Sequence, residues 1–284
     1  MSRTFFRKSF CVWDGIIATA VPVFFLLFAL FSCGNVRQSF IGSFAIVGLM
    51  MTIGLSIEAI IETLKNIKGL GKVVAFITNG PEAVCLIVGL AAGDIIYAAS
   101  TPLGSNLMNP VMGVAAALIS GSLASAARTQ PFYTITSAAV TLVLAASFFW
   151  IIQFGPAMVA GWLVLTVIVS ALVFIRAPTE VDIEVEDLEI EKMWLVPALL
   201  MLMGGGYYLD DVVTFTAEAS RTPKGVIGFF VLSSLTSWPE FKSALVLFRR
   251  KRPVDAMLNI IISNVTNLWL AGSGVTLWLA RQLG

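Results

Sequence analysis

The sequence predicts an all-α polytopic membrane protein, with about nine transmembrane helices in two inverted repeats whose helices break at the membrane midplane. Three observations lead to this prediction. The chain is 58% hydrophobic and 12% charged over 284 residues, which leaves too little polar surface for a soluble domain. Its apolar residues fall into runs long enough to cross a bilayer. A polar motif occurs twice within those runs, with the same internal spacing.

Each predicted transmembrane helix is an apolar run, because a spanning helix needs about 20 mostly apolar residues. The candidate runs are 11–31, 41–63, 73–92, 95–122, 133–153, 157–175, 193–209, 226–248 and 256–280. The first run follows basic residues, as a signal peptide does, but it exceeds the roughly 7 to 15 apolar residues of a signal core. Asp14 also interrupts its start. We therefore expect a retained N-terminal helix rather than a cleaved signal.

Basic residues in the loops predict the orientation. If the N-terminus is cytoplasmic, 13 of the 18 Lys and Arg residues lie at inner loops and four at outer loops. The inner residues are Arg3, Arg7, Lys8, Lys65, Lys68, Lys72, Arg128, Arg176, Lys192, Arg249, Arg250, Lys251 and Arg252, and the outer residues are Arg37, Arg221, Lys224 and Arg281. We expect an integral protein of the plasma (cytoplasmic) membrane with its N-terminus inside and its C-terminus outside. In this orientation the two motif helices run in opposite directions, so the repeats are inverted.

The spans divide the chain into four parts. These are an extra N-terminal helix and loop at 1–40, a first half at 41–175 with its repeat at about 73–122, an acidic cytoplasmic linker at 176–192, and a shortened second half at 193–284 with its repeat at about 226–280. The linker carries seven acidic residues. Such a charge run is usually a solvated connection, and a cation-collecting segment is the alternative interpretation.

The repeated motif has the form Thr-x-x-Pro-Glu followed by Ser-Asn-x-x-Asn. Its first copy begins with Thr78-Asn79-Gly80-Pro81-Glu82 and its second with Thr236-Ser237-Trp238-Pro239-Glu240. A serine follows each glutamate after 23 residues and an asparagine after 27 residues, which gives Ser105 and Asn109 in the first copy and Ser263 and Asn267 in the second. Agreement at this many positions by chance is improbable, so the sequence indicates a duplication.

The motif brings oxygen ligands into apolar helices. Each threonine lies four residues before the glutamate, so we expect both on one helix face. Each proline lacks an N–H and displaces a carbonyl, which is expected to leave Ile77 O and Leu235 O unpaired. Carboxylate, hydroxyl and carbonyl oxygens are the ligands that Ca²⁺ and similar hard cations prefer. The chain contains no histidine, which disfavours a Zn²⁺ or Cu site.

Two glutamates within the membrane need a compensating partner. A single carboxylate at the bilayer centre costs at least about 2.5 to 3.5 kcal/mol on insertion scales. A bound cation or a proton compensates Glu82 and Glu240, and ionisable residues of this kind are usually functional. The structural alternative is that they pair with polar neighbours or with Lys242 and only lock helix packing.

These residues resemble the two α-repeats of the Na⁺/Ca²⁺ exchangers in the calcium/cation antiporter superfamily. The resemblance is closest at Lys224–Phe229 leading into Thr236–Glu240, and at Gly104–Asn109. It implies two inverted five-helix halves, electrogenic exchange of Na⁺ for Ca²⁺ and a central ion cluster. In that cluster Glu82 and Glu240 would be shared carboxylates, and Thr78 and Thr236 would add carbonyl or hydroxyl oxygen. The flanking Na⁺ positions would be lined by Ser105, Asn109, Ser237, Ser263 and Asn267.

The sequence also departs from the family pattern. Asn79 stands where the family has serine, so one flanking Na⁺ ligand is altered, and Ile262 stands where glycine precedes the serine of the second repeat. Lys242 lies two residues after Glu240, where it is either a surface residue or a tethered cation that competes for the site. The last two helices of the family fold are missing after the second repeat, so we expect a homo-oligomer, or the extra N-terminal helix, to fill the gap.

Two functions follow from these observations. The first is a secondary antiporter that exchanges Ca²⁺ for Na⁺, with H⁺ or another cation as alternatives, by sliding its gating helices against the motif core. The second is a non-transporting membrane scaffold or assembly subunit with a structural cation site, or with Lys242 in that site. We expect no enzymatic activity and no cofactor besides the transported ions. The partners are cations and lipid, and no nucleic acid is expected because the basic residues lie in short loops.

Overall fold

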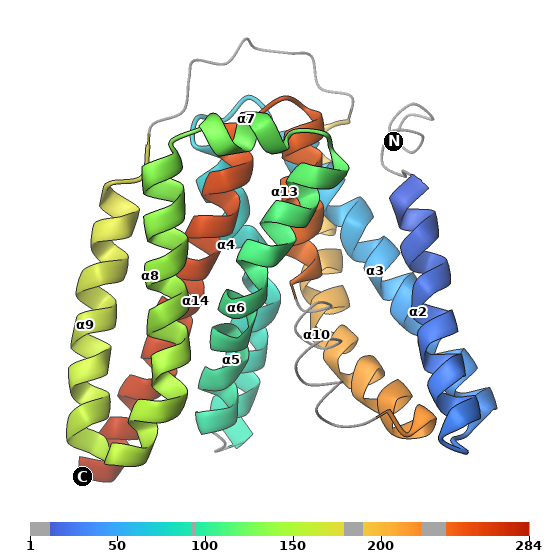
Figure 1. Ribbon diagram of the computed structural model, residues 1–284, viewed down its shortest axis with the longest axis horizontal. Coiled ribbons are helices and arrows are strands. Elements are labelled where there is room, and N and C mark those ends of the chain that lie inside the picture. The colour runs from blue at the N-terminus through green and yellow to red at the C-terminus, as the bar shows by residue number, and fades with distance from the viewer. Residues whose placement is uncertain (1–11, 93–94, 179–189, 223–236, 284) are drawn as a thin grey trace. The chain divides into compact units, whose positions relative to one another are not determined.

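The computed structural model describes residues 12–92, 95–178, 190–222 and 237–283 (Figure 1). These residues form α-helices, two short 3-10 helices (Ile152–Phe154 and Lys192–Trp194) and connecting turns, without a strand in the described ranges. An all-helical fold is therefore confirmed for this part of the chain.

Six described helices are long and apolar enough to cross a membrane. They are α2 (Val12–Phe31), α3 (Val36–Leu64), α6 (Ile95–Ile119), α8 (Pro131–Ile151), α9 (Pro156–Ile175) and α14 (Pro253–Leu283). These apolar helices support an integral membrane protein. Each coincides with a predicted span, and the full count of nine stays a prediction.

The other three predicted spans have different outcomes. The run 73–92 is divided between α4 (Leu70–Thr78) and α5 (Gly80–Ala92). The run 193–209 lies in α10 (Leu195–Ser220), which continues beyond the predicted end. The run 226–248 begins outside the described residues and ends in α13 (Trp238–Arg249).

The chain forms two compact units, and each combines segments that are distant in the sequence. The first unit contains Met1–Lys65 and Val185–Pro239, and the second contains Asn66–Glu184 and Glu240–Gly284. Each unit therefore draws on both of the predicted sequence halves. The four-part division of the sequence itself stays a prediction.

The first unit is built on the packing of α3 against α10, with α2 against both. The two long helices approach closely at glycines, because a side chain there would collide with the neighbouring helix. A Cβ atom on Gly205 would lie 3.0 Å from Ile53 Cγ1, and one on Gly42 would overlap the Thr216 side chain. Small residues at such contacts are typical of helix packing in membranes.

The second unit is organised around α14, which contacts α4, α5, α6, α8, α9 and the short helix α7 (Leu123–Arg128). One apolar core cluster joins α6, α8, α9 and α14 and contains Leu103, Leu144, Ala145, Phe148, Val159, Trp162, Leu268, Ala271, Val275 and Leu279. Within it, Trp162 Nε1 donates to Leu144 O at 3.0 Å, which satisfies the indole N–H in the apolar interior. Both site glutamates belong to this unit: Glu82 lies within its first segment, and its second segment begins at Glu240.

Within the second unit, α5 and α13 run in opposite directions (Figure 1). Helix α5 leads away from the end of the unit where α7 lies, and α13 leads toward that end. This is the arrangement that inverted repeats require. The complete duplication remains a prediction, because the stretch before the second motif lies outside the described residues.

Candidate functional site

The first motif lies at a break between two helices. Helix α4 ends at Thr78 and α5 begins at Gly80, with Asn79 between them. We expected Thr78 and Glu82 on one helix face, which is wrong because they lie on different helices, although a break in the motif helix itself was predicted. Glycine before proline weakens the helix, and Pro81 supplies no N–H, so the chain ends one helix and starts another. The unpaired Ile77 carbonyl was also wrongly predicted, since it receives the Asn79 N–H.

The second motif is described from Ser237 onward. Glu240 lies in the first turn of α13, as Glu82 lies in the first turn of α5. Thr236 and Leu235, with the predicted free carbonyl, lie outside the described residues. Ser237 is described with the first unit, and its hydroxyl is buried without a hydrogen-bond partner there.

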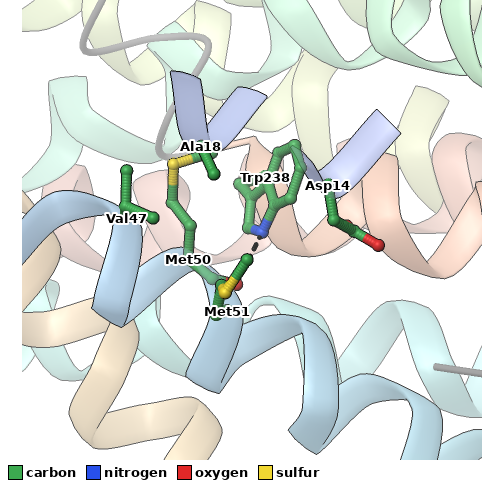
Figure 2. Close-up of a pocket in the computed structure, with 6 residues that line it drawn as sticks. All are labelled: Asp14, Ala18, Val47, Met50, Met51 and Trp238. Atoms are coloured by element: carbon green, nitrogen blue, oxygen red, sulfur yellow. Dashed lines mark hydrogen bonds between the residues drawn. The ribbon is translucent and has the colours of Figure 1, made fainter. Parts of the chain in front are cut away.

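Trp238 anchors this motif within the first unit. Its Nε1 donates to Met50 O of α3 at 3.0 Å. Figure 2 shows the indole beside a pocket that α2 and α3 also line, through Asp14, Ala18, Val47, Met50 and Met51. The extra N-terminal helix thus helps to enclose the residue that starts α13.

The two glutamates lie together in the interior of the second unit. Glu82 is 3% exposed and Glu240 is 0% exposed, and their carboxylates are close enough to repel each other. Among the described residues, neither Glu82 Oε2 nor Glu240 Oε2 has a hydrogen-bond partner. Lys242 is buried as well, but its ammonium does not satisfy these two oxygens. The pair therefore presents two carboxylate oxygens without protein donors.

Neutral polar side chains surround the glutamates. Ser105, Asn109, Ser263 and Asn267, all of them predicted site residues, are buried on α6 and α14. Ser263 Oγ lies 3.2 Å from Glu240 Oε1, and Asn109 Nδ2 donates to Ser263 Oγ at 3.3 Å. The side chains of Ser105 and Asn267, and Asn109 Oδ1, have no partner among the described residues.

Asn79 and Thr78 lie against the same cluster. Asn79 Nδ2 donates to Ala75 O at 2.8 Å and to Ser263 O at 3.3 Å, while Asn79 Oδ1 lies 3.1 Å from Ser263 Oγ. The Thr78 side chain is adjacent to the Glu240 carboxylate. Eight of the ten predicted residues therefore lie in this polar region of the second unit or on the helices that form it, while Ser237 belongs to the first unit and Thr236 lies outside the described residues.

Two asparagines that the prediction omitted support this region. Asn106 Nδ2 donates to Asn264 O at 3.0 Å, and Asn264 Oδ1 accepts from Asn109 Nδ2 at 2.9 Å. Asn264 Nδ2 donates to Thr141 Oγ1 of α8 at 3.2 Å. Both asparagines are the second residue of the repeated Ser-Asn-x-x-Asn, so the repetition itself was the signal that identifies them.

The arrangement can hold a cation through oxygen atoms. No group of three or more His, Cys, Asp or Glu side chains occurs in the described part of the chain. A cation here would be coordinated by two carboxylates and by neutral hydroxyl, amide and carbonyl oxygens. Such ligands suit hard cations such as Ca²⁺ and Mg²⁺ better than transition metals.

Comparison with known proteins gives one match. Residues 192–282 match the family described as sodium/calcium exchanger protein. A search of curated proteins found no match, and a search of solved structures found none either. The matched range includes α10, α13 and α14, and therefore Glu240, Ser263 and Asn267.

Proposed function

The match over residues 192–282 supports membership of this chain in the sodium/calcium exchanger family, and on that basis we propose that it exchanges Ca²⁺ for Na⁺ across a membrane. Members of this family are cation antiporters and not enzymes. We propose Glu82 and Glu240 as the two carboxylates that bind the transported ions.

The observation that carries the proposal is the pair of unpartnered carboxylate oxygens. Two neighbouring buried carboxylates, each with one oxygen that has no donor, are unfavourable unless a positive charge lies near them. Lys242 does not satisfy the two oxygens, which favours a mobile cation over the scaffold alternative with a tethered ammonium. Glu82 and Glu240 together balance the charge of one divalent cation, or of two monovalent ones.

The neutral oxygens complete the proposed coordination. Calcium takes 6 to 8 oxygen ligands at about 2.3 to 2.6 Å. The two glutamates supply up to four, and the unpartnered oxygens of Ser105, Asn109 and Asn267 are candidates for others. Because these groups are neutral, the two glutamates set the charge of the proposed site, which one Ca²⁺ or two monovalent ions would neutralise.

Alternating access needs two parts that move against each other. The division of the chain into two compact units, one built on α3 and α10 and the other on α14, is compatible with this requirement. We propose that the units move relative to each other during transport, with the N-terminus in the cytoplasm of a plasma membrane as the loop charges predict.

The test is uptake of ⁴⁵Ca²⁺ into proteoliposomes that contain the full chain, with an imposed outward Na⁺ gradient. We expect gradient-driven uptake by the wild type and its loss in both Glu82→Gln and Glu240→Gln. Glu218→Gln is the matched control, because Glu218 is an exposed glutamate on α10. Equal uptake with and without the gradient, or uptake that survives both site substitutions, would overturn the proposal.

The coupling ion is tested in the same vesicles. A pH gradient without Na⁺ replaces the Na⁺ gradient in one series. Uptake driven by Na⁺ alone supports Na⁺/Ca²⁺ exchange, and uptake driven only by the pH gradient replaces it with the Ca²⁺/H⁺ alternative.

A further inference from the structure

The two motif copies contact each other directly in the second unit. Asn106 and Asn264 occupy equivalent positions in the two copies, and Asn106 Nδ2 bonds to Asn264 O across a separation of 158 residues. The same separation relates Glu82 to Glu240, Ser105 to Ser263 and Asn109 to Asn267. Each glutamate can therefore be considered with the polar residues that the two copies place around it, and the two sets can be compared.

The cluster around Glu240 is closed by protein hydrogen bonds. Ser263 Oγ lies within hydrogen-bonding distance of both Glu240 Oε1 (3.2 Å) and Asn79 Oδ1 (3.1 Å), and it accepts from Asn109 Nδ2 (3.3 Å). The Asn79 amide nitrogen takes two backbone carbonyls, those of Ala75 and Ser263. Every side chain of this cluster except Glu240 Oε2 and Asn109 Oδ1 is thereby satisfied.

The equivalent cluster around Glu82 is open. Ser105 Oγ, both polar atoms of Asn267 and Glu82 Oε2 are buried without partners. Asn109 bonds to Ser263, and a Cβ on Gly113 would lie 3.1 Å from Ile260, so α6 and α14 are antiparallel in a register that sets Ser105 opposite Asn267. Asn109 and Ser263 are hydrogen-bonded to each other, whereas the equivalent residues Asn267 and Ser105 are not. Among the polar positions of the repeated motif from its second residue onward, the two copies differ in residue type at one, which is asparagine in the first copy and serine in the second.

Asn79 is that asparagine. At the equivalent position of the second copy stands Ser237, which has no amide. The Asn79 –NH₂ group carries two donor hydrogens and donates to the backbone carbonyls of Ala75 and Ser263, while the Ser263 hydroxyl lies 3.2 Å from Glu240 Oε1. A monovalent cation would use the same acceptors, because alkali ions coordinate carbonyl and carboxylate oxygen. The amide therefore stands where a small cation would otherwise bind.

We propose that Asn79 permanently replaces one monovalent cation, so that ions bind only between the glutamates and on the Glu82 side. Its consequence, a lower number of Na⁺ ions exchanged per Ca²⁺, rests on the proposed function. It assigns Asn79 a role in setting stoichiometry, in place of the ligand role that the sequence predicts.

The test counts bound ²²Na⁺ on the purified full chain in detergent, so it does not depend on transport. Asn79→Ser restores the residue type of the second copy, and we expect it to bind one more Na⁺ per protein than the wild type. Asn79→Ala also removes the amide, and we expect an additional site of weaker affinity. Asn35→Ser is the control, because it makes the same substitution at the exposed N-cap of α3 in the first unit, and its count should not rise.

The outcomes separate the two proposals. Equal counts for the wild type and both Asn79 variants, including no binding in any of them, would overturn the inference. If the variant binds an additional Na⁺ but neither the variant nor the wild type shows gradient-driven Ca²⁺ uptake, the inference is supported and the antiporter proposal is refuted. In active vesicles, the Na⁺ to Ca²⁺ ratio from the reversal potential should rise by one in Asn79→Ser. Size-exclusion profiles and thermal unfolding establish that each variant is folded.

Discussion

Removal of the Asn264 amide is expected to destabilise the second unit. The side chain joins three helices: it accepts from Asn109 Nδ2 on α6 at 2.9 Å and donates to Thr141 Oγ1 on α8 at 3.2 Å, from its own position on α14. Asn264 is 0% exposed, so no lipid or water contact compensates for the lost bonds. Asn264→Ala therefore removes two interhelical hydrogen bonds at once.

The size of the effect follows from the value of such bonds in membranes. Interhelical hydrogen bonds in membrane proteins average about 0.6 kcal/mol and reach about 1.7 kcal/mol. Thr141 keeps its own bond to Ser137 O, and Asn109 keeps Ser263 Oγ, so neither partner is left entirely unpaired. The expected loss is about 1 to 3 kcal/mol of unfolding free energy. For a chain of this size that lowers Tm by roughly 3 to 10 °C.

The assay is thermal unfolding in detergent, followed by tryptophan fluorescence. Ser273→Ala serves as the control, because Ser273 is an exposed residue of the same helix that bonds only within its own turn. Thr141→Val alone should cost less than Asn264→Ala, and the double variant should show a coupling near 0.6 kcal/mol. If Asn264→Ala melts with the Ser273→Ala control, the reasoning that this amide holds α6, α8 and α14 together is refuted.

Three further predictions use the same preparations. Gly71→Ala should lower Tm by several degrees, because its Cβ would lie 2.7 Å from the Asp255 Cα. Gly161→Ala is the control and should leave Tm unchanged, because no atom lies within 4 Å of the added Cβ. Equal Tm values for the two variants would contradict the close approach of α4 and α14. Trp238→Phe should cost about 1 kcal/mol, since it leaves Met50 O without the indole donor, and an unchanged unfolding midpoint would count against this anchor. Saturating Ca²⁺ should stabilise the wild type by about 2.7 kcal/mol at 100 times Kd, and this shift should vanish when either site glutamate becomes glutamine; a shift that persists would place the ion elsewhere.

The helical fold and the polar motif could be read from the sequence because both depend on local patterns. Runs of about 20 apolar residues predict spans wherever they occur, and the repeated Ser-Asn-x-x-Asn needs only counting. A broken motif helix was predicted, and Gly80 before Pro81 accounts for the division into α4 and α5. The shared helix face of Thr78 and Glu82 was not found, because local propensity locates a break without fixing the orientation of the residues on its two sides.

The role of Asn79 could not be predicted because it depends on a distant segment. Its amide reaches Ser263 O, 184 residues later in the chain, and no local pattern reports that approach. The sequence identified Asn79 as an altered ligand at one flanking Na⁺ position. The same applies to Asn264, whose partners on α6 and α8 are known only once the three helices are packed.

Each unit combines segments that are distant in the sequence, and this affects when its helices can pack during synthesis. Helix α3 packs against α10, and α6 packs against α14, so each contact waits for a helix made about 150 residues later. At roughly 5 to 20 residues per second, a ribosome needs about 8 to 30 seconds to make that stretch. During this interval Asn106 and Asn109 are already synthesised while their partners on α14 do not yet exist. The early helices therefore either stay near the insertion machinery or hold these amides against temporary partners, until the last helix arrives and completes the second unit.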